Sequence, residues 1–432
     1  MEIPKKYLEQ LPPELHEYFK LWYKTFNERG ERLGRYDFAE LVGKSPNTVR
    51  RWIKKFKTVI GQADKPHDQI QHEQNIKLLQ DQIQYWKRKY SKLLRRSSFE
   101  YAFIEAAKHL MQALPQSKPA QITGLPATKK RVRENLTLII SDLHAGEVVS
   151  SAETYGFNEY NSQIMLNRLS NLFGKMLDIS QSKLIGYQFD TLYIDLLGDM
   201  VSGVIHDELI ATGDLSIVEA ILVTAVGLAY CISAVAPYFR KVHIHGVTGN
   251  HGRLTKQKQY KQAYANYDYL IYQLLKILLA KHDNIQFTFP KSWFLVYENN
   301  GYRVCMFHGD SIRTWAGVPW YGIQRAIAKL SKILAKKELI IDIWEMGHFH
   351  QDANIPDDVL INGSIIGPSE YAMKAMHSIS PAMQKMYGVH KDVGITFMYR
   401  LRPDKESKLK IKLPQELYNL TLDKDMLEIL MK

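Results

Sequence analysis

The sequence predicts an α/β fold class for residues 135–402 and an all-helical region in front of it. Two observations predict the α/β part. Short β-branched strands alternate with helical patterns from Leu136 onward, and each of these strands ends in polar residues. The front region shows apolar residues at helical spacing instead. With 432 residues, the chain is long enough for two or three domains and for a core that needs no disulfide.

Composition shifts divide the chain further. We expect a helical domain at 1–62, a coiled-coil or helical segment at 67–114, and a basic linker at 115–134 that contains three prolines. The α/β domain would follow at 135–402, with a C-terminal tail at 403–432.

The helical domain contains a two-helix pattern behind an amphipathic helix at Glu14–Asn27. In DFAELVGKSPNTVRRWIKKF, Ala39 is small where two helices approach, and Gly43 can take a positive φ at the turn. Ser45 can cap the next helix, which starts with Pro46. This segment resembles the helix-turn-helix motif, although a plain helical hairpin can share its spacing.

The second helix of this pattern carries a basic cluster. Val49 and Ile53 are expected to face inward, with Trp52 and Phe56 as further packing residues. The exposed side would then lie where a recognition helix meets DNA phosphates and base edges. The residues expected to contact DNA are Ser45, Asn47, Thr48, Arg50, Arg51, Lys54, Lys55 and Lys57.

Charge is distributed unevenly along the chain. Residues 1–134 hold 27 Lys and Arg against 15 Asp and Glu, whereas residues 135–432 hold 30 of each kind. All of the net positive charge therefore lies in the first third. This distribution favours a nucleic-acid-binding module attached to a neutral body, and the alternative is a solvated basic face without a partner.

Behind the basic cluster, three heptads indicate a short coiled coil and hence a homo-oligomer, most simply a dimer. A helix that packs on its own chain is the alternative, and a second helix is expected at about Phe99–Leu114. The two heptad rows are Ile76, Ile83 and Tyr90, and Leu79, Trp86 and Leu93.

One uncharged run, Ala220–Pro237, is long enough to be mistaken for a membrane helix. Charged residues flank it closely and no second such run exists, so we expect a buried core helix and no membrane partner. Cys231 and Cys305 lie in apolar runs and are expected to be buried free thiols. The N-terminal sequence shows no signal peptide, so we expect a cytoplasmic protein.

In the α/β domain, five predicted strands end in residues that can bind metal ions. In a turn or an extended chain, residues i and i+2 point the same way, so an Asp-x-His or His-x-His pair can share one ion. Each motif alone is common in loops, but five in succession are not. The residues are Asp142 and His144, Asp199, Asn250 and His251, His308, and finally His348 and His350.

This order of D-x-H, G-D, G-N-H, H and G-H-x-H resembles the calcineurin-like metallophosphoesterase superfamily over residues 136–400. The resemblance implies a four-layer sandwich of two mixed sheets flanked by helices. The overall build, with the loop after Asn362-Gly363-Ser364, looks like proteins of phages, prophages or other mobile elements, which would place it in the host cytoplasm.

The resemblance also implies roles. It assigns one metal to Asp142, His144 and His350, a second to Asn250, His308 and His348, and a bridging position to Asp199. His251 would not be a ligand but would lie over the substrate phosphate as an acid or a charge stabiliser. Arg253 could contact phosphate, or make a surface salt bridge instead. Nuclease members often carry an acidic residue where this chain has Gly252, which leaves close kinship open.

Two divalent ions would neutralise the phosphate and lower the pKa of a bridging water, giving a bridging hydroxide as the nucleophile. The mixed nitrogen and oxygen ligands suit Mn²⁺, Fe or Zn²⁺ better than Mg²⁺. We further expect His206–Glu208 to line the cleft or to cap a helix, and His243 and His245 to be structural. Residues 361–391 show few strand signals and resemble a substrate-side loop, with an ordinary surface loop as the alternative.

The motif G-D-M-V-S-G lacks the arginine that protein phosphatases of this superfamily carry, which argues against a phosphoprotein substrate. The first hypothesis is therefore a DNA endo- or exonuclease that the basic helix delivers to the duplex. A small-molecule phosphatase or cyclic-nucleotide phosphodiesterase, with the N-terminal region used for oligomerisation, is the second. The third is a DNA-binding regulator or packaging factor on a phosphoesterase scaffold.

Overall fold

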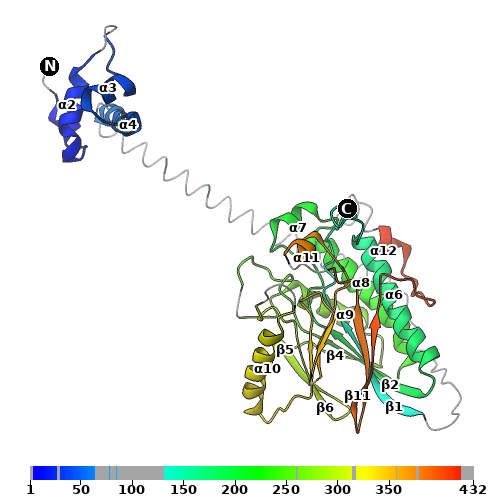
Figure 1. The fold of residues 1–432 in the computed structure, drawn as a ribbon. Coiled ribbons are helices and arrows are strands. Elements are labelled where there is room, and N and C mark those ends of the chain that lie inside the picture. Colours follow the sequence, from blue (N-terminus) through cyan, green and yellow to red (C-terminus); the bar gives the residue numbers. More distant parts are fainter. Residues whose placement is uncertain are drawn as a thin grey trace. The chain divides into compact units, whose positions relative to one another are not determined.

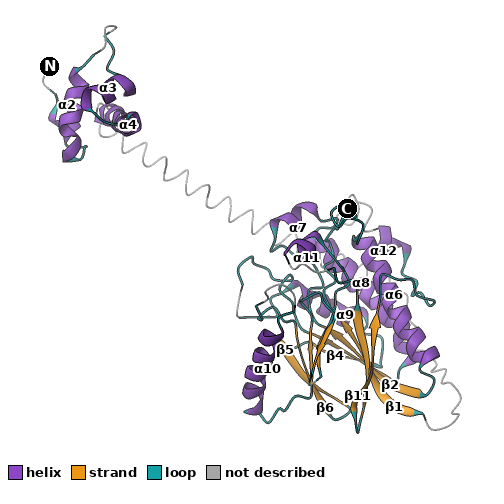
Figure 2. Cartoon of the chain, viewed as in Figure 1, coloured by secondary structure: helices purple, strands orange, loops and turns teal. Residues whose placement is uncertain are grey.

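The structure of the protein is a computed structural model, and it describes residues 3–26, 30–63, 77, 84, 131–258, 261–313, 318–356, 358–375 and 379–419. The chain divides into two compact units, Met1–Ser98 and Phe99–Lys432, which we describe separately (Figures 1 and 2). The predicted heptad rows, the helix expected at about 99–114 and the linker up to residue 130 lie outside the described residues.

The first unit is a small helical bundle. Its core is aromatic, because Phe19, Trp22, Phe38 and Phe56 are all at most 1% exposed. The Phe19 and Phe56 rings meet edge to face, with centroids 5.2 Å apart. Its elements are α1 (Lys5–Leu8), η1 (Pro13–Leu15), α2 (His16–Lys24), α3 (Arg35–Val42) and α4 (Pro46–Ala63).

A tight turn joins α3 to α4. Gly43 has a φ of +62° and its backbone N–H caps the end of α3, which is why the turn favours glycine. The Ser45 hydroxyl accepts the backbone N–H of Thr48 at 3.2 Å and so caps the start of α4. Val49 is buried, and the Trp52 ring packs against that of Tyr18 with centroids 4.5 Å apart and planes tilted by 32°. Two helices and a turn thus lie where the pattern predicts them, while DNA binding stays a prediction.

The second unit is a mixed α/β fold built on two sheets. The first sheet has the order β11-β10-β1-β2-β3-β4, with β1 to β4 parallel. The second has the order β5-β6-β7-β9-β8, with β6, β7 and β9 parallel. The first sheet contains β1 (Val132–Ile140), β2 (Tyr187–Leu196), β3 (Lys241–Gly246), β4 (Ile285–Thr288), β10 (Gln384–His390) and β11 (Gly394–Leu401). The second contains β5 (Phe294–Asn299), β6 (Tyr302–Phe307), β7 (Ile343–Met346), β8 (Ala353–Ile355) and β9 (Val359–Ile361).

The two faces of these strands pack against different partners, which gives a four-layer sandwich. Leu138 and Ile194 face a core shared with α6 (Ser162–Asp178), α8 (Ile217–Val235) and α9 (Tyr267–Leu278). Ile139 of β1 faces the other way, into an apolar layer that it shares with Val304 of the second sheet. The outer face of the second sheet packs on α10 (Trp320–Ala335). The remaining short elements are η2 (Ile179–Lys183), α7 (Asp207–Thr212), η3 (Ala236–Tyr238), α11 (Glu370–Ala375) and α12 (Gln415–Asn419).

The uncharged run forms a core helix. In the described part of the chain, one helix is long and apolar enough to span a membrane, and 67% of that stretch, within Ile217–Tyr238, is buried inside the protein. Ser216 and Glu219 form a capping box at its start. Cys231, on this helix, and Cys305 are buried free thiols, as the sequence predicts.

Two predicted boundaries are wrong. The linker does not reach residue 134, because β1 begins at Val132, which pairs with Tyr187 of β2. Residues 403–419 of the predicted C-terminal tail pack on the α/β domain. Leu417 is 2% exposed in the core beneath α8, and the Ser170 hydroxyl donates to the Ile411 carbonyl, so apolar contacts and a hydrogen bond hold this segment on the domain.

The predicted loop at 361–391 is also corrected. It contains α11 and all of β10, which lies in the first sheet between β11 and β1. Because this strand is buried on both faces, its sequence does not alternate polar with apolar residues. Met386 packs toward the helices, whereas Tyr387 and Val389 pack between the sheets.

Candidate metal centre

The seven predicted ligands all follow the carboxyl ends of parallel strands. Strands β1, β2 and β3 place Asp142 and His144, Asp199 and Asn250 at one edge of the first sheet. Strands β6 and β7 place His308, His348 and His350 at the corresponding edge of the second sheet. Because the two sheets pack face to face, these two edges meet, and the structure brings all seven side chains together.

The first group contains Asp142, His144 and His350. The Nε2 atoms of His144 and His350 lie 3.0 Å apart, and Nε2 of His350 lies 3.4 Å from an Asp142 carboxylate oxygen. Asp142 also accepts the backbone N–H of His348 at 3.1 Å, which ties the first motif to the last.

The second group contains Asp199, His308 and His348, with Asn250 beside them. Nε2 of His308 lies 2.9 Å from an Asp199 oxygen, 3.1 Å from the Asn250 amide oxygen and 3.2 Å from Nδ1 of His348. Asp199 also belongs to a third group, with His144 and His251, and the donor atoms of each group lie within 4.8 Å of one another. Its carboxylate therefore lies next to residues of both groups, while its role as a bridge stays a prediction.

The arrangement fits a cation. Nδ1 of His308 lies 2.7 Å from the Leu197 carbonyl, to which it can only donate. In a neutral ring this leaves a lone pair on Nε2, which faces two oxygen acceptors and another imidazole nitrogen. Such a convergence of lone pairs is unfavourable unless positive charge lies among them. The donor set of imidazole, carboxylate and amide oxygen suits Mn²⁺, Fe or Zn²⁺.

The protonation energetics reflect the same demand for positive charge. Burial opposes the charged form of His308, but the charge of Asp199 prevails and raises its pKa to about 10. Although burial works against ionisation of Asp199, the neighbouring His308 holds its pKa well below the usual range. Burial and the charge of His308 lower the pKa of His348 to about 4. The buried carboxylates thus favour the protonated form of the His308 imidazole. A bound metal ion could supply that positive charge in place of the proton.

Backbone strain is concentrated in the same residues. Asp142, His144, Asp199, His348 and His350 all have φ between 52° and 71°. Residues other than glycine rarely adopt this left-handed region, and they do so where the surrounding structure enforces it, often at functional sites. The sequence gives no sign of this strain.

Two further polar residues position the ligands. Asp268, at the start of α9, accepts the backbone N–H groups of Asp199, Met200 and Gly249 at 2.8–3.0 Å. Asn266 caps α9 and donates to the Gly249 carbonyl. These residues were not predicted, because Asn-x-Asp at a helix start looks like an ordinary cap.

Gly249 permits a close approach to the bridging carboxylate. A Cβ atom added there would overlap both the carboxylate and the backbone nitrogen of Asp199. Glycine is therefore required where the second and third motifs meet.

Glu147 and Ser202 support the histidines and were not predicted either. A Glu147 carboxylate oxygen lies 3.5 Å from Nδ1 of His144 and accepts the Ser202 hydroxyl at 3.0 Å. An acceptor at Nδ1 leaves Nε2 of His144 free to bind a metal ion. The pKa of Glu147 is raised, mainly by burial.

His251 lies beside the metal ligands. Its ring centroid is 4.5 Å from that of His144, its backbone N–H donates to Asp199 at 2.7 Å, and its Nδ1 lies 3.1 Å from the Ser202 carbonyl. The His206 ring is 5.4 Å away, whereas Asp207 pairs with Lys256.

Other predicted site residues have structural partners. Nε of Arg253 donates to the Asn250 carbonyl at 2.8 Å and holds the loop, so its contact with phosphate stays a prediction. His245 is buried and its Nδ1 lies 2.9 Å from Asp195, while the His243 ring stacks on Tyr193. In the first unit, Thr48 is partly buried and the other predicted DNA contacts, Ser45, Asn47, Arg50, Arg51, Lys54, Lys55 and Lys57, are exposed.

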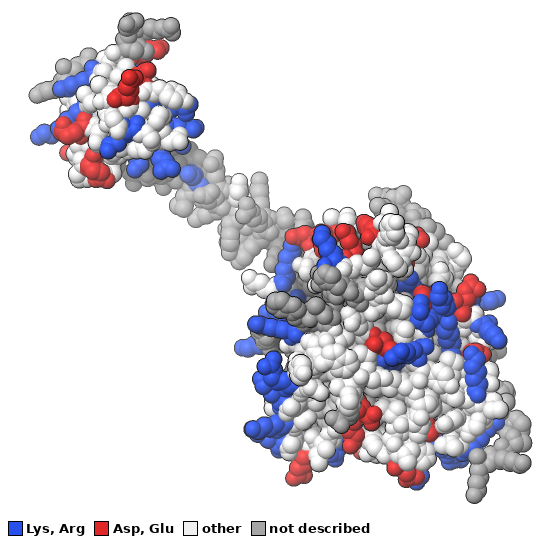
Figure 3. Space-filling view, viewed as in Figure 1, with Lys and Arg blue, Asp and Glu red and all other residues white. Residues whose placement is uncertain are grey.

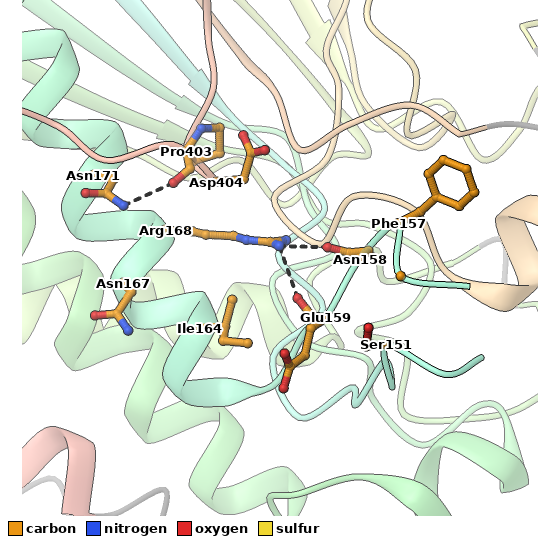
Figure 4. A pocket seen from close by; sticks show the side chains of 11 residues that line it. Ser151, Phe157, Asn158, Glu159, Ile164, Asn167, Arg168, Asn171, Pro403 and Asp404 are labelled. Atoms are coloured by element: carbon orange, nitrogen blue, oxygen red, sulfur yellow. Dashed lines mark hydrogen bonds between the residues drawn. The ribbon is translucent and has the colours of Figure 1, made fainter. Parts of the chain in front are cut away.

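A hollow of about 420 Å³ is lined by none of the seven predicted ligands (Figure 4). Arg168 lies at its centre, but its terminal nitrogens donate to Asn158, Glu159, Ile365 and Ile366. Both terminal nitrogens of this guanidinium hold the loop that follows the last motif in place, whereas its buried Nε has no hydrogen-bond partner among the described residues.

Comparisons with known proteins find distant structural likenesses only. No family model matches the chain, and neither does any curated protein. A hypothetical protein from Pyrococcus horikoshii is 12% identical over 69% of this chain and 97% of its own, with a TM-score of 0.33. A predicted phosphoesterase from Streptococcus pneumoniae is 13% identical over 63% and 92%, with a TM-score of 0.27. Vps29 with Zn²⁺ from Entamoeba histolytica is 13% identical over 62% and 99%, with a TM-score of 0.24. At such values these likenesses establish no family for the chain.

Proposed function

We propose that the protein is a two-metal phosphodiesterase that hydrolyses DNA, and that the basic face of α4 delivers it to the duplex. The observation that supports the chemistry is the convergence of seven donor side chains from five strand ends on one point. Within it, Nε2 of His308 lies within 3.2 Å of an Asp199 oxygen, the Asn250 amide oxygen and Nδ1 of His348. Structural histidines instead find single partners, as His245 does with Asp195.

In this proposal one metal is held by Asp142, His144 and His350, and the other by Asn250, His308 and His348, with Asp199 contacting both. When bound, the two ions would neutralise the substrate phosphate and activate water. Mn²⁺ is the first choice and Fe or Zn²⁺ the alternatives, since Mg²⁺ prefers all-oxygen ligands.

The chain's own residues then orient the substrate and move a proton. Backbone and Nδ1 contacts fix the His251 ring, so Nε2 is the atom left to face the phosphate. From there it can give a proton to the departing oxygen or stabilise charge on the phosphoryl group. Glu147 and Ser202 hold His144 in place, and Asp268 holds the backbone of the bridging Asp199.

DNA as the substrate is supported by the first unit. Arg50, Arg51, Lys54, Lys55 and Lys57 are exposed on α4, and none of them makes an ion pair within the described residues. Unpaired basic side chains on one helix fit the phosphate backbone of a duplex. Self-association through the coiled coil remains part of the proposal.

Metal-dependent cleavage is the decisive assay. With Mn²⁺, the full-length protein should cleave plasmid DNA and leave p-nitrophenyl phosphate intact, and chelation should abolish cleavage. Hydrolysis of bis-p-nitrophenyl phosphate with untouched DNA would favour a small-molecule phosphodiesterase. Tight DNA binding without turnover of any ester would favour a regulator on a phosphoesterase scaffold.

A further inference from the structure

A stripe of basic residues runs along α10, on the outer face of the second sheet. Arg325, Lys329, Lys332 and Lys336, which we call the basic stripe, are all exposed. Their spacing of four, three and four residues places them on one side of the helix. Figure 3 shows basic side chains gathered along the edge of the body where α10 runs in Figure 1.

The basic stripe is not balanced by acids. From 311 to 337 the sequence contains six Lys and Arg and no Asp or Glu, although residues 135–432 as a whole are neutral. Within the described residues, none of the four side chains makes an ion pair or a side-chain hydrogen bond. The negative C-terminal end of a helix attracts basic residues in its last turn, but Arg325 and Lys329 lie before that turn.

The first turn of α10 packs on the chain segment that follows His308. Ile312 follows the predicted ligand His308 along the chain and packs in the same apolar cluster as Ile323 of α10. A Cβ atom added at Gly322, in the first turn of α10, would lie 3.1 Å from the Ile312 side chain. A polymer bound along α10 would therefore lead toward the predicted ligands.

We propose that the basic stripe binds the phosphate backbone of the nucleic acid whose ester bond the metal centre hydrolyses. From Arg325 to Lys336 the helix rises about 16 Å, which matches about five nucleotide steps of one strand. This inference rests on the proposed function, because it extends the DNA-binding surface from α4 to the catalytic unit.

An anionic membrane is the competing partner for a basic helix. Helices that lie in a membrane surface bury their apolar face in lipid. The apolar face of α10 is already occupied, because Ile323, Leu330 and Leu334 pack against the second sheet. Beyond the first turn of α10, Ile333 is the one large apolar side chain among the described residues of this helix that stays exposed. A polyanion therefore fits this face better than a bilayer does.

The test compares two full-length variants that lose the same charge. One carries Lys329→Gln, Lys332→Gln and Lys336→Gln. The control carries Lys405→Gln, Lys408→Gln and Lys412→Gln, which are exposed residues in the C-terminal segment on the other side of the sandwich. Both also carry Asp199→Ala, so that a fluorescent 30-base-pair duplex stays intact while binding is measured against salt.

The stripe variant should bind the duplex at least about tenfold more weakly near 0.1 M salt. Its plot of log affinity against log salt should be shallower by about 0.9 for each phosphate that is no longer neutralised, hence by up to about 2.7. The control should match its parent. With Asp199 restored, both variants should hydrolyse bis-p-nitrophenyl phosphate at the parental rate.

Unchanged affinity and salt slope in the stripe variant would overturn this inference and leave the nuclease proposal standing. If the parent neither binds nor cleaves DNA, the proposed function itself is wrong. Vesicles of phosphatidylserine and phosphatidylcholine test the competitor. Loss of vesicle binding in the stripe variant, with unchanged DNA binding, would assign α10 to a membrane surface instead.

Discussion

The two units of the chain place their charges in opposite environments. On α4, Arg50, Arg51 and Lys54 are exposed and make no ion pair within the described residues. In the second unit, Asp142 and Asp199 are at most 1% exposed, and each is contacted by imidazoles and backbone N–H groups. Exposed charges can be removed at little cost to the fold, whereas a buried charge needs its partners. Binding and chemistry should therefore be separable by mutation.

The largest expected effect comes from Asp199→Ala. Losing the carboxylate that we propose contacts both metal ions should reduce hydrolysis of DNA and of bis-p-nitrophenyl phosphate by about a thousandfold or more, since metal assistance contributes several kcal/mol. DNA affinity should change little, because the side chain is buried in the second unit and the exposed basic residues of α4 belong to the first. Rates on both substrates and equilibrium binding of a duplex check this prediction, and a parallel loss of binding would contradict the division of labour.

Gly249→Ala breaks the same centre through the backbone. The added Cβ would overlap the Asp199 carboxylate, so we expect weaker binding of Mn²⁺ by at least about tenfold and a matching loss of turnover. Isothermal titration with Mn²⁺ measures the first effect directly. Gly186→Ala is the matched control, because nothing lies within 4 Å of its added Cβ and its φ is not positive. Equal Mn²⁺ affinity in the two variants would exclude the predicted clash.

Features that depend on local sequence could be predicted. Strand ends are readable, because each apolar run stops at a polar motif, and parallel strands bring such ends together. Asp142, Asp199 and His308 were found in this way. The caps on either side of the turn between α3 and α4 were equally readable, since Gly43 and Ser45 act locally.

Features that depend on distant partners were not predictable. Asp268 supports Asp199 from 69 residues away, and no local pattern distinguishes it from a helix cap. Strand β10 is buried on both faces, so it lacks the alternation that marks a half-buried strand. The basic stripe on α10 is a local pattern that could have been read from residues 311–337, although the neutral total of residues 135–432 does not reveal it.

Mutation of the exposed basic residues of α4 should have a smaller, graded effect. Arg50→Ala with Arg51→Ala should weaken duplex binding and reduce the salt slope by about 0.9 for each phosphate left without its basic partner. Hydrolysis of bis-p-nitrophenyl phosphate should stay at the parental rate, because that substrate needs no duplex binding. Lys5→Ala with Lys24→Ala removes the same charge from exposed positions on α1 and α2 and serves as the control. If the Arg50/Arg51 variant and the Lys5/Lys24 control reduce the salt slope equally, DNA binding is diffuse and α4 is not a recognition helix.

A second buried pair of acids lies between the sheets, away from the seven predicted ligands. Tyr387 donates to Glu345 at 2.7 Å, and Tyr297 donates to Asp195 at 2.6 Å. Burial, and then the charge of Asp195, raise the pKa of Glu345 well above its usual range. Where Asp199 would rely on metal ions for its positive charge, Glu345 keeps a proton instead.

That proton makes stability depend on pH in a defined direction. In the unfolded chain Glu345 loses its proton above about pH 4.5, whereas in the folded chain it keeps it, so its stabilising contribution is complete below that pH and is lost as pH rises toward the raised value. Above about pH 4.5 and up to the raised pKa of Glu345, this group should lower the free energy of unfolding by up to about 1.4 kcal/mol per pH unit. Glu345→Gln keeps the shape and an N–H donor but cannot ionise, so denaturant melts of this variant should show a shallower decline. An equally steep decline would mean that Glu345 is ionised in the folded protein. Its negative charge would then be balanced by neighbouring groups and not by a bound proton.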